Sequence, residues 1–170
     1  MLVFVTAVVL SQAPAVSPIA QFKDACFKTF PDLAAARAFA KKSGWKQRKT
    51  ADAAALASGN WSEDFEISAQ RTLKLHSDSN RGSCSIVFGE EAVETKGFIA
   101  SVEKELEVKR DQKAEDAWNK VGLSGTGNSA LVWRGGKPKG TIVSSLVKDK
   151  EGKAYELFIG HPFFVGAQAE

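Results

Sequence analysis

Apolar and polar residues alternate along the segment 65–75. The apolar side chains fall on odd positions, and polar or charged side chains stand between them. This period of two predicts a half-buried β-strand, bent near Arg71. The polar segment 77–82 predicts a turn, and the segment 84–88 predicts a returning strand with Cys84 on its inner face. The apolar positions of the first strand are Phe65, Ile67, Ala69, Leu73 and Leu75.

Two stretches switch to helical spacing. Thr29 is a suitable N-cap, Pro31 and Asp32 suit a first turn, and apolar positions then recur over 33–40 until Gly44 ends the helix. The second stretch, Glu90 to Val108, carries an apolar stripe at Phe98, Ile99, Val102 and Leu106. Shorter helices are expected at 52–57, opened by Thr50 and closed by Gly59, and within 111–121.

The C-terminal third predicts three strands joined by turns rich in glycine and charge. They are Ala130–Arg134, Thr141–Lys148 and Ala154–Ile159. Hairpins dominate this order of elements. We therefore expect an α+β domain over residues 16–170, with a mainly antiparallel sheet of about five strands and two main helices packed on one face.

The N-terminal segment is apolar and carries no charged side chain before Lys23. Residues 1–10 have the length of a signal-peptide core, and Ala13-Pro14-Ala15 fits a cleavage site that leaves Val16 first. We therefore expect residues 1–15 to be a signal peptide, and the protein to be periplasmic or secreted, without a transmembrane segment in its mature form. The segment lacks the opening Lys or Arg of most signal peptides. The alternatives are a start further upstream or a buried strand.

Composition changes this picture little. A hydrophobic fraction of 44% and a charged fraction of 25% are ordinary globular values, and a net charge of +3 predicts no nucleic-acid partner. One cluster is denser in cations: Lys41, Lys42, Lys46, Arg48 and Lys49. It is either an edge that contacts an anionic surface or a solvated helix end, where cations favour the dipole.

The interpretation of the two cysteines, Cys26 and Cys84, depends on the export prediction. In an oxidising compartment they are expected to form one disulfide. The alternative is a pair of reactive thiols, for which no C-x-x-C spacing is present.

Residues with catalytic potential are few. His76 and His161 are the only histidines, and neither has the spacing of a metal site. We expect no catalytic residue, no metal site and no cofactor. The glycine-rich segment precedes a strand and lacks the P-loop Gly-Lys-Ser/Thr, so it is either a connector or a partner-facing loop. Its candidate binding residues are Gly122, Ser124, Gly125, Thr126, Gly127 and Asn128.

The four tryptophans are Trp45, Trp61, Trp118 and Trp133. Packing in the core is the simpler interpretation of each. Tryptophans exposed together would instead mark a binding face.

The stretch 25–32, ACFKTFPD, followed by Ser43-Gly44-Trp45 and the later Cys84, resembles the start of small exported alphaproteobacterial proteins of unknown function. The resemblance covers mainly residues 25–45. It implies a periplasmic setting and brings no catalytic residues.

These features predict an exported binding or interaction domain with an unknown protein or envelope ligand as its partner. One alternative is a small periplasmic hydrolase with carboxylate or serine chemistry; a pocket holding two convergent carboxylates, or a Ser–His contact, would favour it. The other is an envelope protein that binds anionic surfaces through the lysine-rich cluster.

Overall fold

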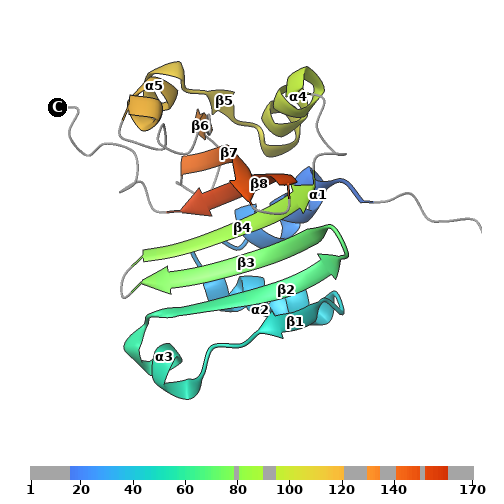
Figure 1. Cartoon of the computed structure of the whole chain (residues 1–170), viewed down its shortest axis with the longest axis vertical. Helices are drawn as coiled ribbons and strands as arrows, with labels where there is room; N and C mark the ends of the chain where they lie inside the picture. Colours follow the sequence, from blue (N-terminus) through green and yellow to red (C-terminus); the bar gives the residue numbers. More distant parts are fainter. Residues whose placement is uncertain are drawn as a thin grey trace, which may run out of the picture.

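The protein is described by a computed structural model covering residues 16–78, 81–89, 95–120, 130–134, 141–149 and 152–160 (Figure 1). Eight strands in these residues form one antiparallel sheet, in the order β1-β2-β3-β4-β8-β7-β6-β5. The strands are β1 Lys46–Lys49, β2 Trp61–Ser68, β3 Arg71–Asp78, β4 Arg81–Gly89, β5 Lys109–Arg110, β6 Ala130–Arg134, β7 Thr141–Asp149 and β8 Gly152–Gly160.

The helices are distributed around this sheet (Figure 1). The helices α1 and α2, with the π-helical turn η1, lie on one face of β3 and β4, and α4 packs beside α1 and η1. The helix α3 belongs to the connection between β1 and β2, and α5 packs against β6. Their bounds are α1 Pro18–Phe22, η1 Lys23–Phe27, α2 Leu33–Lys42, α3 Ala53–Ser58, α4 Thr95–Leu106 and α5 Gln112–Lys120.

The core lies between this helical layer and the covered face of the sheet. Every second residue of a strand contributes to it, because successive side chains point to opposite faces of the sheet. Residues that stand directly opposite each other on paired strands lie on the same face. Leu75 stands opposite Cys84, which stands opposite Ile159, and all three are fully buried. The predicted stripe of α4 faces the same core, where Phe98 contacts Phe88 with ring centroids 5.8 Å apart.

The α+β class, the antiparallel sheet and the two main helices on one face are confirmed. The three C-terminal strands lie where their patterns predicted them. The larger strand count has two causes. The stretch 65–75 is a hairpin of β2 and β3 and not one bent strand, and the short strands β1 and β5 carry no apolar pattern.

The hairpin cannot be recognised from the sequence, because its turn keeps core-facing residues at odd positions on both strands. Phe65 pairs with Leu73 and Glu63 with Leu75, so odd positions face the core on both strands. A tight turn of this register leaves apolar alternation uninterrupted, and a hairpin then has the same pattern as one long strand.

Local capping sets the helix starts. Asp32 caps α2 by accepting a hydrogen bond from Ala35 N at 3.0 Å, and Asp52 caps α3 by accepting one from Ala55 N at 2.7 Å. Thr29 and Thr50 were predicted to begin these helices and do not. Thr29 instead donates back to the Ala25 carbonyl at 2.7 Å. Asp32 and Asp52 cap the helices because each stands at the N-cap position, three residues before the amide whose hydrogen bond its carboxylate accepts.

The helical segment α1–η1 was not predicted, although it carries a sequence signal. Ser17 caps it and Pro18 follows in its first turn. Phe22 and Cys26 recur at helical spacing and are both fully buried. The segment begins directly after the predicted cleavage site, which itself lies outside the described residues. No helix in the described residues is long and apolar enough to cross a membrane.

The predicted disulfide is confirmed. Cys26 of η1 is bonded to Cys84 of β4, with the two Cα atoms 5.4 Å apart. Both half-cystines are fully buried. The bond ties the N-terminal helical segment to a central strand across 58 positions of sequence.

Candidate functional site

An open cavity of about 480 Å³ lies between the β1–β2 connection and the adjoining ends of β2 and β3. The connection is shaped by α3, whose end is fixed by Gly59 in the left-handed conformation at φ 75°. The chain then turns directly into Trp61, the first residue of β2. The cavity wall includes Lys49, Asn60, Trp61, Ser62, His76 and Asp78.

Strand register brings these residues together. Ser62 stands opposite His76, and Trp61 stands opposite Ser77. Neighbouring residues of a strand point to opposite faces. The cavity receives side chains from both faces because it lies where the two strands end.

The indole of Trp61 is held from the helical layer. The guanidinium of Arg37, from α2, lies over the ring at 4.7 Å from its centroid. Arg37 Nε donates to Glu63 Oε2 at 2.5 Å, and the Glu63 side chain is only 3% exposed. A buried carboxylate needs such a partner, because an unpaired charge at this site would be costly. Arg37, Glu63 and Trp61 therefore form one connected unit, and of the three only Trp61 borders the cavity.

Sequence reasoning singled out Trp61 but not the rest of this unit. Arg37 and Glu63 lie 26 positions apart, on a helix and a strand. Only packing brings them together. One feature of the sequence could have indicated this pair: Arg37 and Glu63 carry opposite charges at positions that the helical and strand patterns place on inward faces.

The predicted cationic cluster divides between two elements. Lys41 and Lys42 lie in the last turn of α2, as the helix-end interpretation requires. Lys46, Arg48 and Lys49 form most of the edge strand β1 and are exposed. Arg48 is ion-paired with Glu66 of β2. Lys49 is the member that also borders the cavity.

The other predicted site residues do not take part in this geometry. The glycine-rich segment, with Gly122, Ser124, Gly125, Thr126, Gly127 and Asn128, lies outside the described residues, as does His161. The side chain of Trp118 is also outside the description. Trp133 is fully buried, and Trp45 packs edge-on against Phe39 with centroids 5.5 Å apart, so both serve the core.

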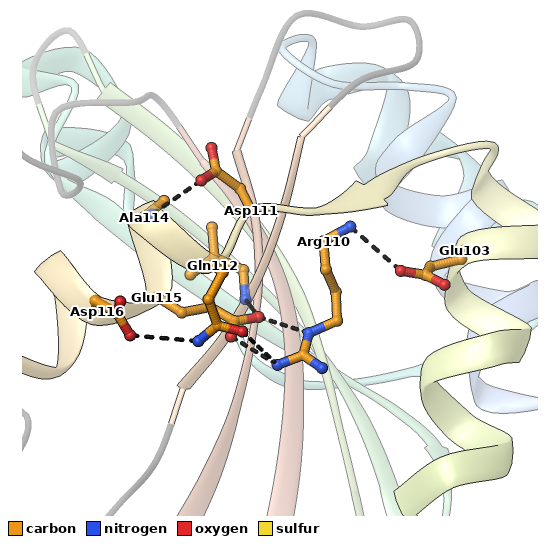
Figure 2. Close-up of polar contacts among 8 residues, drawn as sticks. Glu103, Arg110, Asp111, Gln112, Ala114, Glu115 and Asp116 are labelled. Carbon is orange, nitrogen blue, oxygen red and sulfur yellow. Dashed lines mark hydrogen bonds and ion pairs between the residues drawn. The ribbon is translucent and has the colours of Figure 1, made fainter.

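A second polar cluster surrounds the start of α5 (Figure 2). Glu115 is 2% exposed, and its carboxylate accepts from Arg110 Nε at 2.8 Å and Arg110 Nη2 at 2.7 Å. It also accepts from the backbone N–H of Val132 at 3.1 Å. The hydrogen bond to Glu115 raises the pKa of Arg110 above its ordinary value. The guanidinium therefore remains charged.

This cluster completes a sheet edge. The strand β5 pairs with β6 over only two residues, and Asp111 N then donates to the Val132 carbonyl at 2.8 Å. Beyond that point the Glu115 carboxylate replaces a backbone acceptor for Val132 N–H. The cluster is thus a structural junction that joins α5 to the sheet.

Replacing Glu115 with Ala should lower the free energy of unfolding by about 2 kcal/mol, because Val132 N–H loses its acceptor and Arg110 its partner. Glu115→Gln should cost less, since its amide oxygen can still accept from Val132. Lys113→Ala, on the exposed side of the same helix, is the matched control. Urea denaturation would measure all three, and an unchanged midpoint for Glu115→Ala would contradict the junction.

The groups that could support catalysis were compared among the described residues alone. Among the described residues, no group of three or more His, Cys, Asp or Glu side chains is placed to hold a metal ion. The buried carboxylates Glu63 and Glu115 are each paired with an arginine. Asp52 and Asp78 border the cavity, but Asp52 is used as a helix cap. In the described part of the chain, no hydrogen bond joins His76 to a serine.

Comparisons of the chain with protein-family models, with curated proteins and with solved structures return no match.

Proposed function

We propose that this protein is an exported binding domain, and that its ligand occupies the cavity between the β1–β2 connection and the ends of β2 and β3. The observation that carries the proposal is the indole of Trp61, with the Arg37 guanidinium over its ring, at a concave site that several polar side chains border. Ligand sites are typically concave, of about 300–1,000 Å³, with an aromatic surface and a few convergent polar groups.

Export is supported by the buried disulfide. Such bonds persist in oxidising compartments and are rare in the cytosol. The apolar segment before Lys23 adds to this from the sequence side.

Binding is favoured over catalysis because the cavity is open. A general acid or base usually needs a group whose environment is arranged to perturb its pKa, commonly by burial. The charged groups at this cavity, Lys49, Asp52 and Asp78, are exposed. They suit recognition of a solvated ligand better than activation of a nucleophile.

We expect Trp61→Ala to abolish binding to this cavity, and His76→Gln to weaken it. The test is a thermal-shift and intrinsic-fluorescence screen of the oxidised protein against sugars, amino acids, short peptides, inorganic anions and anionic vesicles, in which each compound is also assayed for turnover. Lys74→Gln is the matched control for His76→Gln, because it is exposed on the same strand two positions away and lies outside the cavity. Trp45→Phe is the control for Trp61.

Two results of this screen would contradict the proposal. One is turnover of a panel compound that depends on Asp78 or His76, which would establish the hydrolase alternative. The other is binding only to anionic vesicles, lost when Lys41, Lys42 and Lys46 are neutralised and retained in Trp61→Ala. Exposed lysines favour that second function, although each exposed charge contributes little by itself.

A further inference from the structure

We infer that this protein docks on the surface of an anionic phospholipid bilayer. The docking edge is formed by the last turn of α2, the strand β1 and the helix α3, which follow one another along the chain. Figure 1 shows β1 and α3 together at the lower end of the molecule, away from α4 and α5. The inference goes beyond the proposed function, because it needs no ligand in the cavity.

The helix α3 is apolar, yet it packs no residue into the core. Alanine and leucine make up all of it except Ser58, and none of its residues is buried. Leu56 is 40% exposed, and Val16 is the only other large apolar side chain exposed among the described residues. Ala55 borders the cavity, whereas Leu56 and the other alanines of α3 are exposed outside its wall. Contiguous exposed apolar residues, unlike isolated ones, mark interaction surfaces.

This apolar surface exists before any partner arrives. Asp52 caps α3 by accepting a hydrogen bond from Ala55 N at 2.7 Å, and Gly59 ends the helix in the left-handed conformation. The helix also contacts β2. A free peptide of this length would not hold a helix in water. The fold therefore supplies the ordering that a disordered membrane-binding peptide has to gain on the bilayer, and docking costs little conformational entropy.

The same edge carries an excess of positive charge. Residues 41–60 include five cations and one acidic residue. Of the cations, Arg48 is ion-paired with Glu66. The other four are exposed and have no ion-pair partner in the described part of the chain: Lys41, Lys42, Lys46 and Lys49. Each lysine close to an anionic leaflet raises the partition onto it by about fivefold.

The acidic side chains near this edge are fewer, and most lie further into the sheet. Asp52 caps α3 and is the one acidic residue of the edge itself. Asp64 stands opposite Lys49 on β2 and is half-buried. Asp78 lies at the end of β3, two strands in from β1. The outermost charges along β1 are therefore positive.

A bilayer fits this combination better than the other possible occupants of the edge. Apolar side chains beside lysines are typical of proteins that lie on anionic bilayers, where the apolar groups enter the headgroup region and the cations approach the lipid phosphates. A soluble acidic macromolecule would use the lysines and leave the apolar helix without a role. A second copy of this chain would cover the helix but bring two sets of lysines together, and such like-charge contacts are unfavourable.

The test is co-sedimentation of the oxidised protein with vesicles. The probes are vesicles of phosphatidylglycerol and phosphatidylcholine in equal parts, vesicles of phosphatidylcholine alone, and soluble polyglutamate. We expect the strongest binding to the anionic vesicles. That binding should weaken as the salt concentration rises, because salt screens the attraction between exposed charges.

Two triple variants test the contribution of charge. Replacing Lys41, Lys42 and Lys46 together with Gln should lower the partition onto anionic vesicles by about a hundredfold, and it leaves the cavity wall unchanged. The matched control removes the same charge around β5, at the opposite edge of the sheet. It should bind nearly as the wild type does, and it replaces three exposed lysines with Gln: Lys104, Lys109 and Lys113.

Leu56→Ser tests the contribution of the apolar helix. It should lower the partition onto anionic vesicles severalfold, because less apolar surface leaves water on docking. Its circular dichroism and urea midpoint should match those of the wild type, since no residue of α3 is buried. If Leu56→Ser is unstable, Ala54→Glu replaces it in the test. Ala54→Glu places a negative charge on the same exposed helix and should also weaken binding.

Several results would overturn the inference. They are equal binding to neutral vesicles, equal loss in the two triple variants, undiminished vesicle binding in a folded Leu56→Ser, and preference for polyglutamate. A dimer that depends on Leu56, in protein that does not bind vesicles, would assign the edge to a second copy of the chain. The proposed function is tested independently. Trp61→Ala should still bind vesicles, and the variant of Lys41, Lys42 and Lys46 should still bind a cavity ligand.

Discussion

Removing the disulfide by Cys26→Ala with Cys84→Ala is expected to lower the free energy of unfolding by about 4 kcal/mol. The bond closes a loop of 58 positions, and closure of a loop of this size restricts the unfolded chain by about that amount. Both sulfurs are fully buried, so the variant also loses packing. This loss is a large share of the free energy of unfolding of a typical protein, which is about 5–15 kcal/mol.

Urea denaturation followed by fluorescence would measure the effect. The wild type unfolded in excess reductant is the natural control, and its midpoint should approach that of the double variant. Identical midpoints with and without reductant would contradict a stabilising bond. Two free thiols by mass spectrometry, in protein taken from an oxidising compartment, would contradict the bond itself.

The second large effect is expected where β4 meets β8. Ile86 and Leu157 stand opposite each other there and are both fully buried. This pairing joins the N-terminal half of the sheet to the C-terminal meander. Ile86→Ala and Leu157→Ala should each cost about 2–4 kcal/mol, as large-to-small core substitutions do. We expect a similar loss for Ile142→Ala, since Ile142 stands opposite Ile159 and Trp133.

Lys74→Ala, an exposed residue of β3, is the control and should change the midpoint little. The double variant of Ile86 and Leu157 should deviate from additivity, because facing residues share one space. Unchanged midpoints for both single variants would show that the two halves of the sheet do not meet here.

Sequence patterns predicted most of the fold because the larger elements carry their own periodicity. The three C-terminal strands are apolar runs separated by turn residues, and α4 buries the stripe of Phe98, Val102 and Leu106. The disulfide followed from compartment and cysteine count, without geometry.

The elements that escaped prediction lack such a signal. The strand β1 reads Lys-Gln-Arg-Lys, because an edge strand solvated on both sides needs no apolar residue. Its place in the sheet is decided by pairing with β2, as in Lys46 opposite Glu66. Here tertiary context sets the structure, and local propensity is a weak guide.

The candidate site was predictable only in fragments. Trp61 and Lys49 attracted attention as residue types, but the cavity depends on the register that sets Ser62 opposite His76. It depends equally on Arg37 reaching across from α2 to Glu63 and the indole. Such contacts between distant elements leave no spacing in the sequence that could be recognised.

The most direct test of the binding site is a ¹H–¹⁵N correlation spectrum recorded while the compound that binds most tightly in the screen is added. The site described here predicts that the Trp61 indole N–H, the Asn60 side-chain amide and the backbone amides of Lys49 and Ser77 shift first and most. Resonances of the Arg110–Glu115 junction should stay in place. Shifts confined to residues outside the cavity, with the Trp61 indole unmoved at saturation, would contradict the assignment of the cavity as the binding site.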